Sequence, residues 1–202
     1  MQKFQLLGLF ITLFAVACTP QTDKIYIITT NDVHSSIDAF PELATLVKQY
    51  ETEGTVLIVD SGDRVSGNAY VDDAKEAGVP IIELMNSVGY DVVTLGNHEF
   101  DKGYEVLNTM IERSEFKWVC ANMKCDKPTD VEAYATFDIN GVSICFVGVV
   151  STENNGFPLG KKSGYEFFTF DNDIDCAKQL GSELTQANDF VILLSHMGYD
   201  MD

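Results

Sequence analysis

Basic residues are scarce in this sequence of 202 residues: 13 lysines and arginines stand against 31 aspartates and glutamates, a formal net charge of −18. The shortage argues against a binder of DNA or RNA polymers, because few cations are available to replace the counterions of a phosphate backbone. It also excludes a basic patch for a membrane surface. With 46% apolar and 22% charged residues, no internal repeat and no low-complexity segment, the chain is predicted to be globular, with about one domain.

Long apolar runs are absent too, and the longest is too short to span a bilayer comfortably. It extends from Leu6 to Phe14, after a single charge at Lys3 and before the small residues Ala15–Ala17. This order is typical of a secretory signal, so residues 1–17 are interpreted as a signal peptide and the protein as exported. Cys18 follows directly and resembles the lipidated cysteine of a bacterial lipobox, which implies a lipid anchor to the membrane in the cell envelope, on its periplasmic or outer-surface side. An ordinary signal peptide with an incidental cysteine is the alternative.

Cysteines are few, and beyond Cys18 the chain has only Cys120, Cys125, Cys145 and Cys176. Outside the cytoplasm these four thiols could form two disulfides, with three possible connectivities. Their spacing is a poor match to a zinc ribbon. The favoured interpretation is that they are small buried apolar side chains, or that one local bridge joins Cys120 and Cys125.

Apolar strands alternate with amphipathic helices after a polar tether at residues 18–23. The strands are expected at residues 24–30, 55–59, 91–95, 117–121, 133–139, 142–150 and 190–194. The helices are expected at residues 40–50, 74–88 (with an irregular start around Gly78 and Pro80), 104–113 and 174–187, and residues 151–170 are expected to be irregular. This order predicts an α/β fold with a mainly parallel sheet covered by helices, plus an antiparallel hairpin that turns at Asn140-Gly141. No boundary to a second domain is visible.

All three histidines of the chain follow a predicted strand: His34, His98 and His196. A lone histidine at such a position is more often structural. In open α/β sheets, however, the functional site lies beyond the carboxyl ends of the strands, and aspartates or asparagines accompany two of these histidines. The sequence therefore predicts a site at this edge of the sheet.

The residue types at these strand ends suit a centre of two divalent cations. Asp32 and His34 are two residues apart, so in an extended chain their side chains would point the same way and bind one cation. Asp63 has two carboxylate oxygens with which to bridge two cations, Asn97 offers a neutral oxygen, and His196 is a candidate ligand of the second. Such a pair would activate water and hold both oxygens of a phosphoryl transfer. Whether the ions are Zn²⁺, Mn²⁺, Fe²⁺, Mg²⁺ or Ca²⁺ stays open.

Taken together, the motifs Asn31-Asp32-Val33-His34, Gly62-Asp63, Gly96-Asn97-His98-Glu99-Phe100-Asp101 and His196 resemble the calcineurin-like metallophosphoesterases, in particular the bacterial 5′-nucleotidase/UDP-sugar hydrolase branch. The resemblance covers residues 24–202. It implies an αββα sandwich, here incomplete, and a two-metal hydrolase that dephosphorylates extracytoplasmic nucleotides or other small phosphoesters.

The resemblance also implies a role for each matching residue. Asp32 and His34 would bind the first metal, Asp63 would bridge, and Asn97 and His196 would bind the second. His98 would stabilise or protonate the leaving oxygen, and Asp101, three residues later, would orient its ring. Glu99 and Phe100 are expected to be structural, and Arg64 is expected either to contact phosphate or to be exposed to solvent.

One departure from the family limits these expectations. The family completes its site with a Gly-His-x-His-type motif beyond the next strand, whereas this sequence ends at Asp202. We therefore expect residues 24–202 to be part of a catalytic domain, without the C-terminal nucleotide-recognition domain or with a split partner chain. Weak or no hydrolysis by this chain alone is expected, together with an exposed apolar sheet face. The alternatives are a non-catalytic envelope lipoprotein, or an inactive fragment of such an enzyme, and a 2′,3′-cyclic nucleotide phosphodiesterase.

Overall fold

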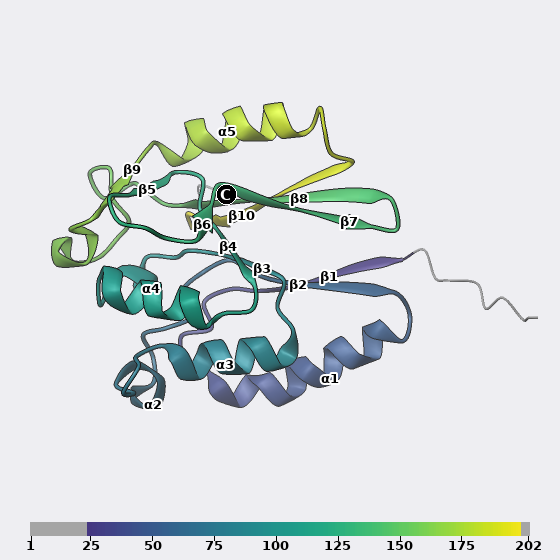
Figure 1. The fold of residues 1–202 in the computed structure, drawn as a ribbon, viewed down its shortest axis with the longest axis horizontal. Coiled ribbons are helices and arrows are strands. Elements are labelled where there is room, and N and C mark those ends of the chain that lie inside the picture. Colours follow the sequence, from purple (N-terminus) through teal and green to yellow (C-terminus); the bar gives the residue numbers. More distant parts are fainter. Residues whose placement is uncertain (1–23, 199–202) are drawn as a thin grey trace, which may run out of the picture.

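Two β-sheets lie face to face in the computed structural model, which describes residues 24–198 (Figure 1). The proposed signal peptide, the tether and Cys18 lie outside the described residues. The larger sheet is entirely parallel, with the strand order β1-β2-β3-β4-β6. Its strands are β1 (Ile25–Thr30), β2 (Thr55–Asp60), β3 (Val92–Thr94), β4 (Lys117–Val119) and β6 (Val131–Glu132).

The second sheet has the order β10-β8-β7 and contains the predicted hairpin. Strands β7 (Tyr134–Ile139) and β8 (Val142–Val150) are antiparallel, and β10 (Phe190–His196) runs parallel to β8. Asn140 and Gly141 both have positive φ angles, of 56° and 82°, as a tight hairpin turn requires. The predicted α/β architecture, mainly parallel with an antiparallel hairpin, is confirmed.

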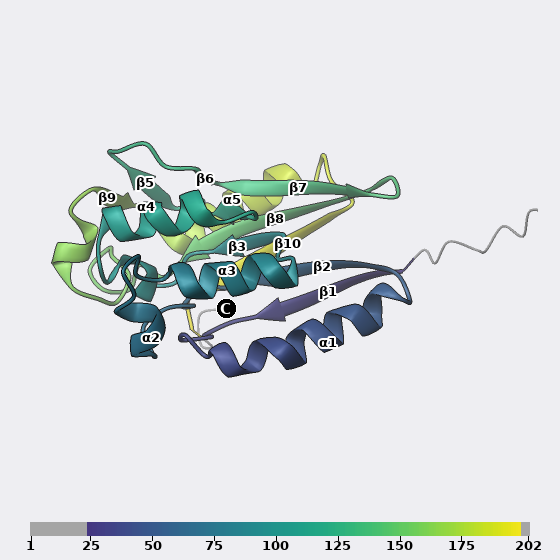
Figure 2. The same ribbon diagram turned by 60° about the horizontal axis from the view of Figure 1, so that its bottom comes forward.

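Helices cover the outer side of both sheets, which gives the order helix, sheet, sheet, helix (Figures 1 and 2). The helices on the larger sheet are α1 (Phe40–Glu51), α3 (Val79–Val88) and α4 (Tyr104–Arg113), and α5 (Asp173–Leu184) covers the second sheet. Alternation along β2 divides the core: Ile58 packs toward the helices, whereas Leu57 and Val59 pack between the sheets.

Two of the differences from the sequence prediction concern the loops near the site. The helix expected at residues 74–88 begins only at Val79, because Gly78 adopts a left-handed φ of 80°, and the short helix α2 (Ala69–Asp72) precedes it. The stretch expected to be irregular contains β9 (Phe168–Phe170), which pairs antiparallel with β5 (Met123–Cys125). Each of these two strands has only three residues, too few for a recognisable alternation.

All four cysteines of the described residues are free thiols, so the suggested bridge between Cys120 and Cys125 is not formed. Cys120 and Cys145 are buried, as small apolar side chains would be, and burial raises the pKa of Cys120 to about 12. Among the helices that the structure describes, none combines the length and the apolar character needed to cross a bilayer.

Candidate metal centre

The candidate site lies at the carboxyl ends of β1, β2, β3 and β10. The loop after β1 is bonded to the loop after β2, since the backbone N–H of Asp32 donates to Gly62 O at 3.1 Å and that of His34 donates to Asp63 O at 3.0 Å. Asp32, His34 and Asp63 all have left-handed backbones, with φ angles of 52°, 45° and 55°. The expectation of an extended chain at Asp32 and His34 is therefore wrong. Their side chains nevertheless meet, with His34 Nε2 3.3 Å from Asp32 Oδ1.

Asp63 stands at the centre of the cluster, and its side chain is buried. Its Oδ2 atom lies 3.3 Å from His196 Nε2, 3.9 Å from His34 Nε2 and 3.9 Å from His98 Nε2. All three histidines of the chain thus converge on one carboxylate oxygen, although they come from segments far apart in the sequence.

Two groups of candidate metal ligands share Asp63, and within each group the ligand atoms lie within 4.8 Å of one another. One group is Asp32, Asp63 and His196, and the other is His34, Asp63 and His98. Four of the five predicted ligands are therefore together. Asn97 directly precedes His98 at the start of a short 3-10 turn, beside the cluster, and its role stays a prediction. Carboxylate and imidazole groups around a shared carboxylate fit a pair of divalent cations.

Backbone carbonyls fix two of the imidazole rings. His196 Nδ1 lies 2.9 Å from Ser61 O, and His34 Nδ1 lies 3.3 Å from Ser66 O. A ring that donates from Nδ1 presents its Nε2 lone pair to a metal, and such carbonyls are common partners of metal-binding histidines. Burial lowers the pKa of His196, but the adjacent Asp63 carboxylate outweighs this effect and raises that pKa to about 9.

His98 has a different partner, the carboxylate of Asp101. His98 Nδ1 lies 2.6 Å from Asp101 Oδ2, so the pairing expected from the three-residue spacing is present. Burial lowers the pKa of His98, but the hydrogen bond and charge of Asp101, together with the Asp63 carboxylate, raise it overall. This ring is partly exposed and lies at the rim of the cluster.

Two glycines allow the loops after β2 and β3 to lie in close contact, because neither position has space for a side chain. A Cβ atom on Gly96 would lie 2.1 Å from Asp63 Oδ1, and one on Gly62 would lie 2.5 Å from the backbone nitrogen of Gly96. Gly62 also has a φ of 103°, which side-chain-bearing residues rarely adopt. Glycine at both positions lets the loops after β2 and β3 approach around Asp63.

Arg64 is a correction to the sequence interpretation, because it neither reaches the site nor meets solvent. It is fully buried, its Nη2 donates to Asp60 Oδ1 at 2.9 Å, and its guanidinium carbon lies 4.4 Å from the centre of the Trp118 ring. Glu99 is structural, as expected, since its buried carboxylate accepts from the backbone nitrogens of residues Asp63 and Arg64.

The profile of the calcineurin-like phosphoesterases matches residues 25–201. The chain belongs to this family. Its lineage is that of a hydrolase, and the two groups of acidic and histidine side chains agree with the divalent metals that the family uses.

Several of the relatives are 5′-nucleotidases. The bovine (Bos taurus) enzyme is 29% identical over 89% of this chain, and that of Vibrio vulnificus is 31% identical over 90% of it. The crystal structure of the 5′-nucleotidase precursor from Thermus thermophilus superposes with a TM-score of 0.75 at 21% identity, and covers 87% of this chain and 38% of its own. The match spans 35% of the length of each of the two sequence relatives.

Proposed function

We propose that this protein hydrolyses phosphoesters with two divalent cations and that its substrates are nucleoside 5′-monophosphates. The observation that carries the proposal is the convergence of His34, His98 and His196 on Oδ2 of Asp63. The names of its relatives support the choice of substrate class.

Each residue then has a distinct task. As the family resemblance implies, Asp32 and His34 would hold one cation, Asn97 and His196 the other, and Asp63 both. The contact between His34 Nε2 and Asp32 Oδ1 at 3.3 Å supports the first pairing, although the ligand groups bring Asp32 close to His196 as well. Cations held there would polarise the phosphoryl group and lower the pKa of the attacking water.

His98 is the proposed proton donor to the leaving oxygen. Its Nδ1 is engaged by Asp101, so its Nε2 faces the centre of the cluster, 3.9 Å from Asp63 Oδ2. A side chain placed in this way can give a proton to an alkoxide as the phosphoester bond breaks.

Export with a lipid anchor at Cys18 is part of the proposal, and it is supported by the sequence of residues 1–18 alone. Mass spectrometry of membrane-bound protein would test it. Loss of residues 1–17 and an acyl mass on Cys18 are the expected findings, and an unmodified Cys18 in the mature chain would contradict the anchor.

Metal content is the first test of the centre. The full chain, loaded with Mn²⁺ and freed of excess ion, is expected to retain two ions, and Asp63→Ala is expected to retain neither because both groups share this carboxylate. Asp130→Ala is the matched control, since Asp130 is an exposed aspartate outside the cluster. Two ions retained by Asp63→Ala would contradict the bridging role.

Phosphate release is the second test, with AMP and 2′,3′-cyclic AMP as parallel substrates in the presence of Mn²⁺. Turnover of AMP is expected to exceed that of the cyclic nucleotide and to fall to background in Asp63→Ala. Retention of two ions without any phosphate release would favour the non-catalytic lipoprotein instead.

A further inference from the structure

We propose that Ser66 is a positioning residue that orients two of the site histidines at once, His98 through its hydroxyl and His34 through its backbone carbonyl. The inference deepens the proposed function and rests on it for the chemistry, but the geometry and its first test stand without any activity. Ser66 lies in the loop between β2 and α2.

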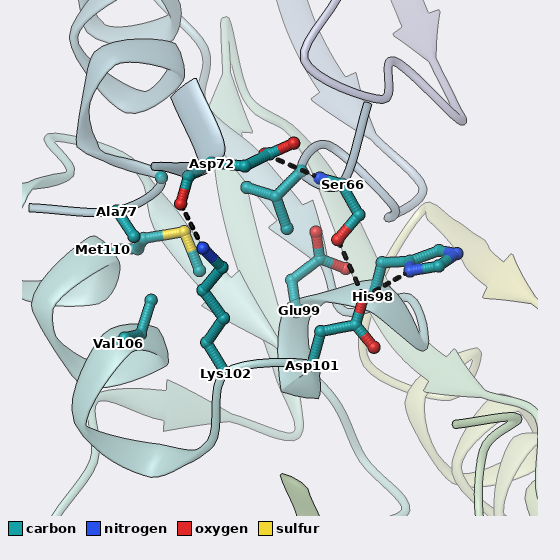
Figure 3. Close-up of a pocket in the computed structure, with 11 residues that line it drawn as sticks. Ser66, Asp72, Ala77, His98, Glu99, Asp101, Lys102, Val106 and Met110 are labelled. Carbon is teal, nitrogen blue, oxygen red and sulfur yellow. Dashed lines mark hydrogen bonds and ion pairs between the residues drawn. The ribbon is translucent and has the colours of Figure 1, made fainter. Parts of the chain in front are cut away.

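The hydroxyl of Ser66 shares an acceptor with His98. Ser66 Oγ donates to Asp101 Oδ2 at 2.8 Å, and the same oxygen lies 2.6 Å from His98 Nδ1. Figure 3 shows the three side chains converging at one end of a small pocket. Asp101 lies at the end of a three-residue turn, and its side chain is one-third exposed. With two donors on one oxygen, the carboxylate is restrained at the angle that the ring of His98 requires.

The backbone carbonyl of Ser66 contacts the second histidine, His34. Ser66 O is 3.3 Å from His34 Nδ1, the ring nitrogen opposite the one that faces Asp32 and Asp63. Because this contact uses the backbone, it survives removal of the hydroxyl. The two effects of Ser66 are therefore separable by mutation.

Asp72 holds Ser66 in place from outside the cluster. Its carboxylate accepts hydrogen bonds from the backbone nitrogens of Ser66, Gly67 and Asn68 at 2.9, 2.8 and 2.9 Å. It also accepts from the hydroxyl of Ser35 at 2.9 Å, which ties the loop after β1 to the same anchor. Figure 3 shows Asp72 beside Ser66 on the side away from His98.

The backbone of Ser66 has an unusual conformation, which is consistent with a loop whose shape serves to position the site histidines. Ser66 has a φ of 70°, which costs free energy in any residue with a side chain. A Cβ atom on the next residue, Gly67, would lie 2.0 Å from His34 O, so only glycine lets the two loops lie this close.

Nuclear magnetic resonance of the metal-free chain, with ¹⁵N-labelled histidine, provides a direct test. The chain has three histidines, so His34 and His196 serve as references within each spectrum. In Ser66→Ala, the Nδ1–H signal of His98 is expected to broaden or disappear as Asp101 gains rotational freedom, while the signals of the other two rings persist. Ser66→Gly is the second variant, because glycine accepts the positive φ without strain and also lacks the hydroxyl.

Ser35→Ala is the matched control, because it removes a hydroxyl from Asp72 without touching Asp101. An unchanged His98 signal in Ser66→Gly would overturn the proposal. So would an equal loss of the His98 signal in Ser35→Ala, because the effect would then be a general loosening of the loops.

Kinetics with Mn²⁺ provide the second readout. Both Ser66 variants are expected to retain two ions and an unchanged KM, with kcat lowered by about tenfold or more, as loss of one hydrogen bond to a charged group predicts. A raised KM or lost metal would contradict a role of the Ser66 hydroxyl that is confined to His98. If the resonance changes but no version of the chain releases phosphate, the positioning role stands and the proposed function fails.

Discussion

The carboxylate of Glu99 holds the backbone of Asp63, whose N–H donates to Glu99 Oε2 at 2.9 Å. The same carboxylate accepts from the backbone nitrogens of Arg64 at 2.9 Å and Gly96 at 2.6 Å. Glu99 is buried at 1% exposure, so these bonds form without competition from water. The loops after β2 and β3 are thereby joined at the backbone of the shared candidate ligand.

Replacement of Glu99 by glutamine is the first prediction. Glu99→Gln keeps the shape but exchanges one acceptor oxygen for a donor, which leaves a buried N–H unpaired and removes a charge beside Arg64. We expect a loss of about 2–4 kcal/mol in the free energy of unfolding and weaker metal binding, measured by urea unfolding and ion titration. Glu153→Gln, at an exposed glutamate, should change neither; equal effects of both variants would contradict a specific role for Glu99.

Much of the fold could be predicted from the sequence because its main elements have long, regular patterns. Helix α4 and strand β8 have the predicted bounds, and β1, β2 and α1 differ from prediction by one residue at an end. The elements that were missed are short: α2 has four residues, β5 and β9 have three each, and β6 has two. Tertiary contacts rather than local pattern determine such segments.

The candidate site was predictable at the level of which residues gather, but not how. The rule that sites lie at the carboxyl ends of strands placed Asp32, His34, Asp63 and His196 together. It gave no indication that Asp32, His34 and Asp63 have left-handed backbones, since non-glycine residues rarely do. The burial of Arg64 was equally hidden, because its guanidinium packs on the ring of Trp118 and donates to the carbonyl of Thr94, which lies 30 positions along the chain.

The second prediction distinguishes a proton donor from a metal ligand at His98. The structure groups His98 with His34 and Asp63, whereas the family resemblance assigns it to the leaving oxygen. We expect His98→Ala to slow phosphate release roughly 100-fold, the typical contribution of a positioned general acid, without loss of bound ions. Elemental analysis of the purified variant measures the ions, and His34→Ala, which should lose one, is the comparison. Loss of an ion from His98→Ala would reassign His98 as a ligand.

The third prediction concerns acid stability at Asp72. Burial raises the pKa of this carboxyl, but the hydrogen bonds that it accepts from Ser66, Ser35 and their neighbours lower it overall. A lowered pKa in the folded state contributes stability above the ordinary aspartate pKa of about 3.9, and this contribution disappears as the pH falls through the folded-state value.

Asp72→Asn is therefore expected to destabilise the metal-free chain by about 2 kcal/mol near pH 7, with a difference from the unmutated protein that shrinks below about pH 4. Urea unfolding at several pH values measures it. Asp73→Asn is the control, because Asp73 has only an exposed ion pair with Lys102. A difference that stays constant down to about pH 3 would show that the charge of Asp72 is not responsible.

The last prediction concerns the apolar side chains that the sequence led us to expect at an uncovered sheet. Phe190 is 59% exposed and Ile27 is 39% exposed. They belong to β10 and β1, and in the described part of the chain each of these strands pairs along one edge only. An open strand edge with exposed apolar groups favours contact with a second copy.

Phe190→Ser is therefore expected to reduce self-association severalfold in sedimentation velocity at high protein concentration. Leu159→Ser removes a residue that is 72% exposed but lies outside the strands, and it should have no effect. Equal reductions by both substitutions would mean that general hydrophobicity, rather than the strand edge, causes association.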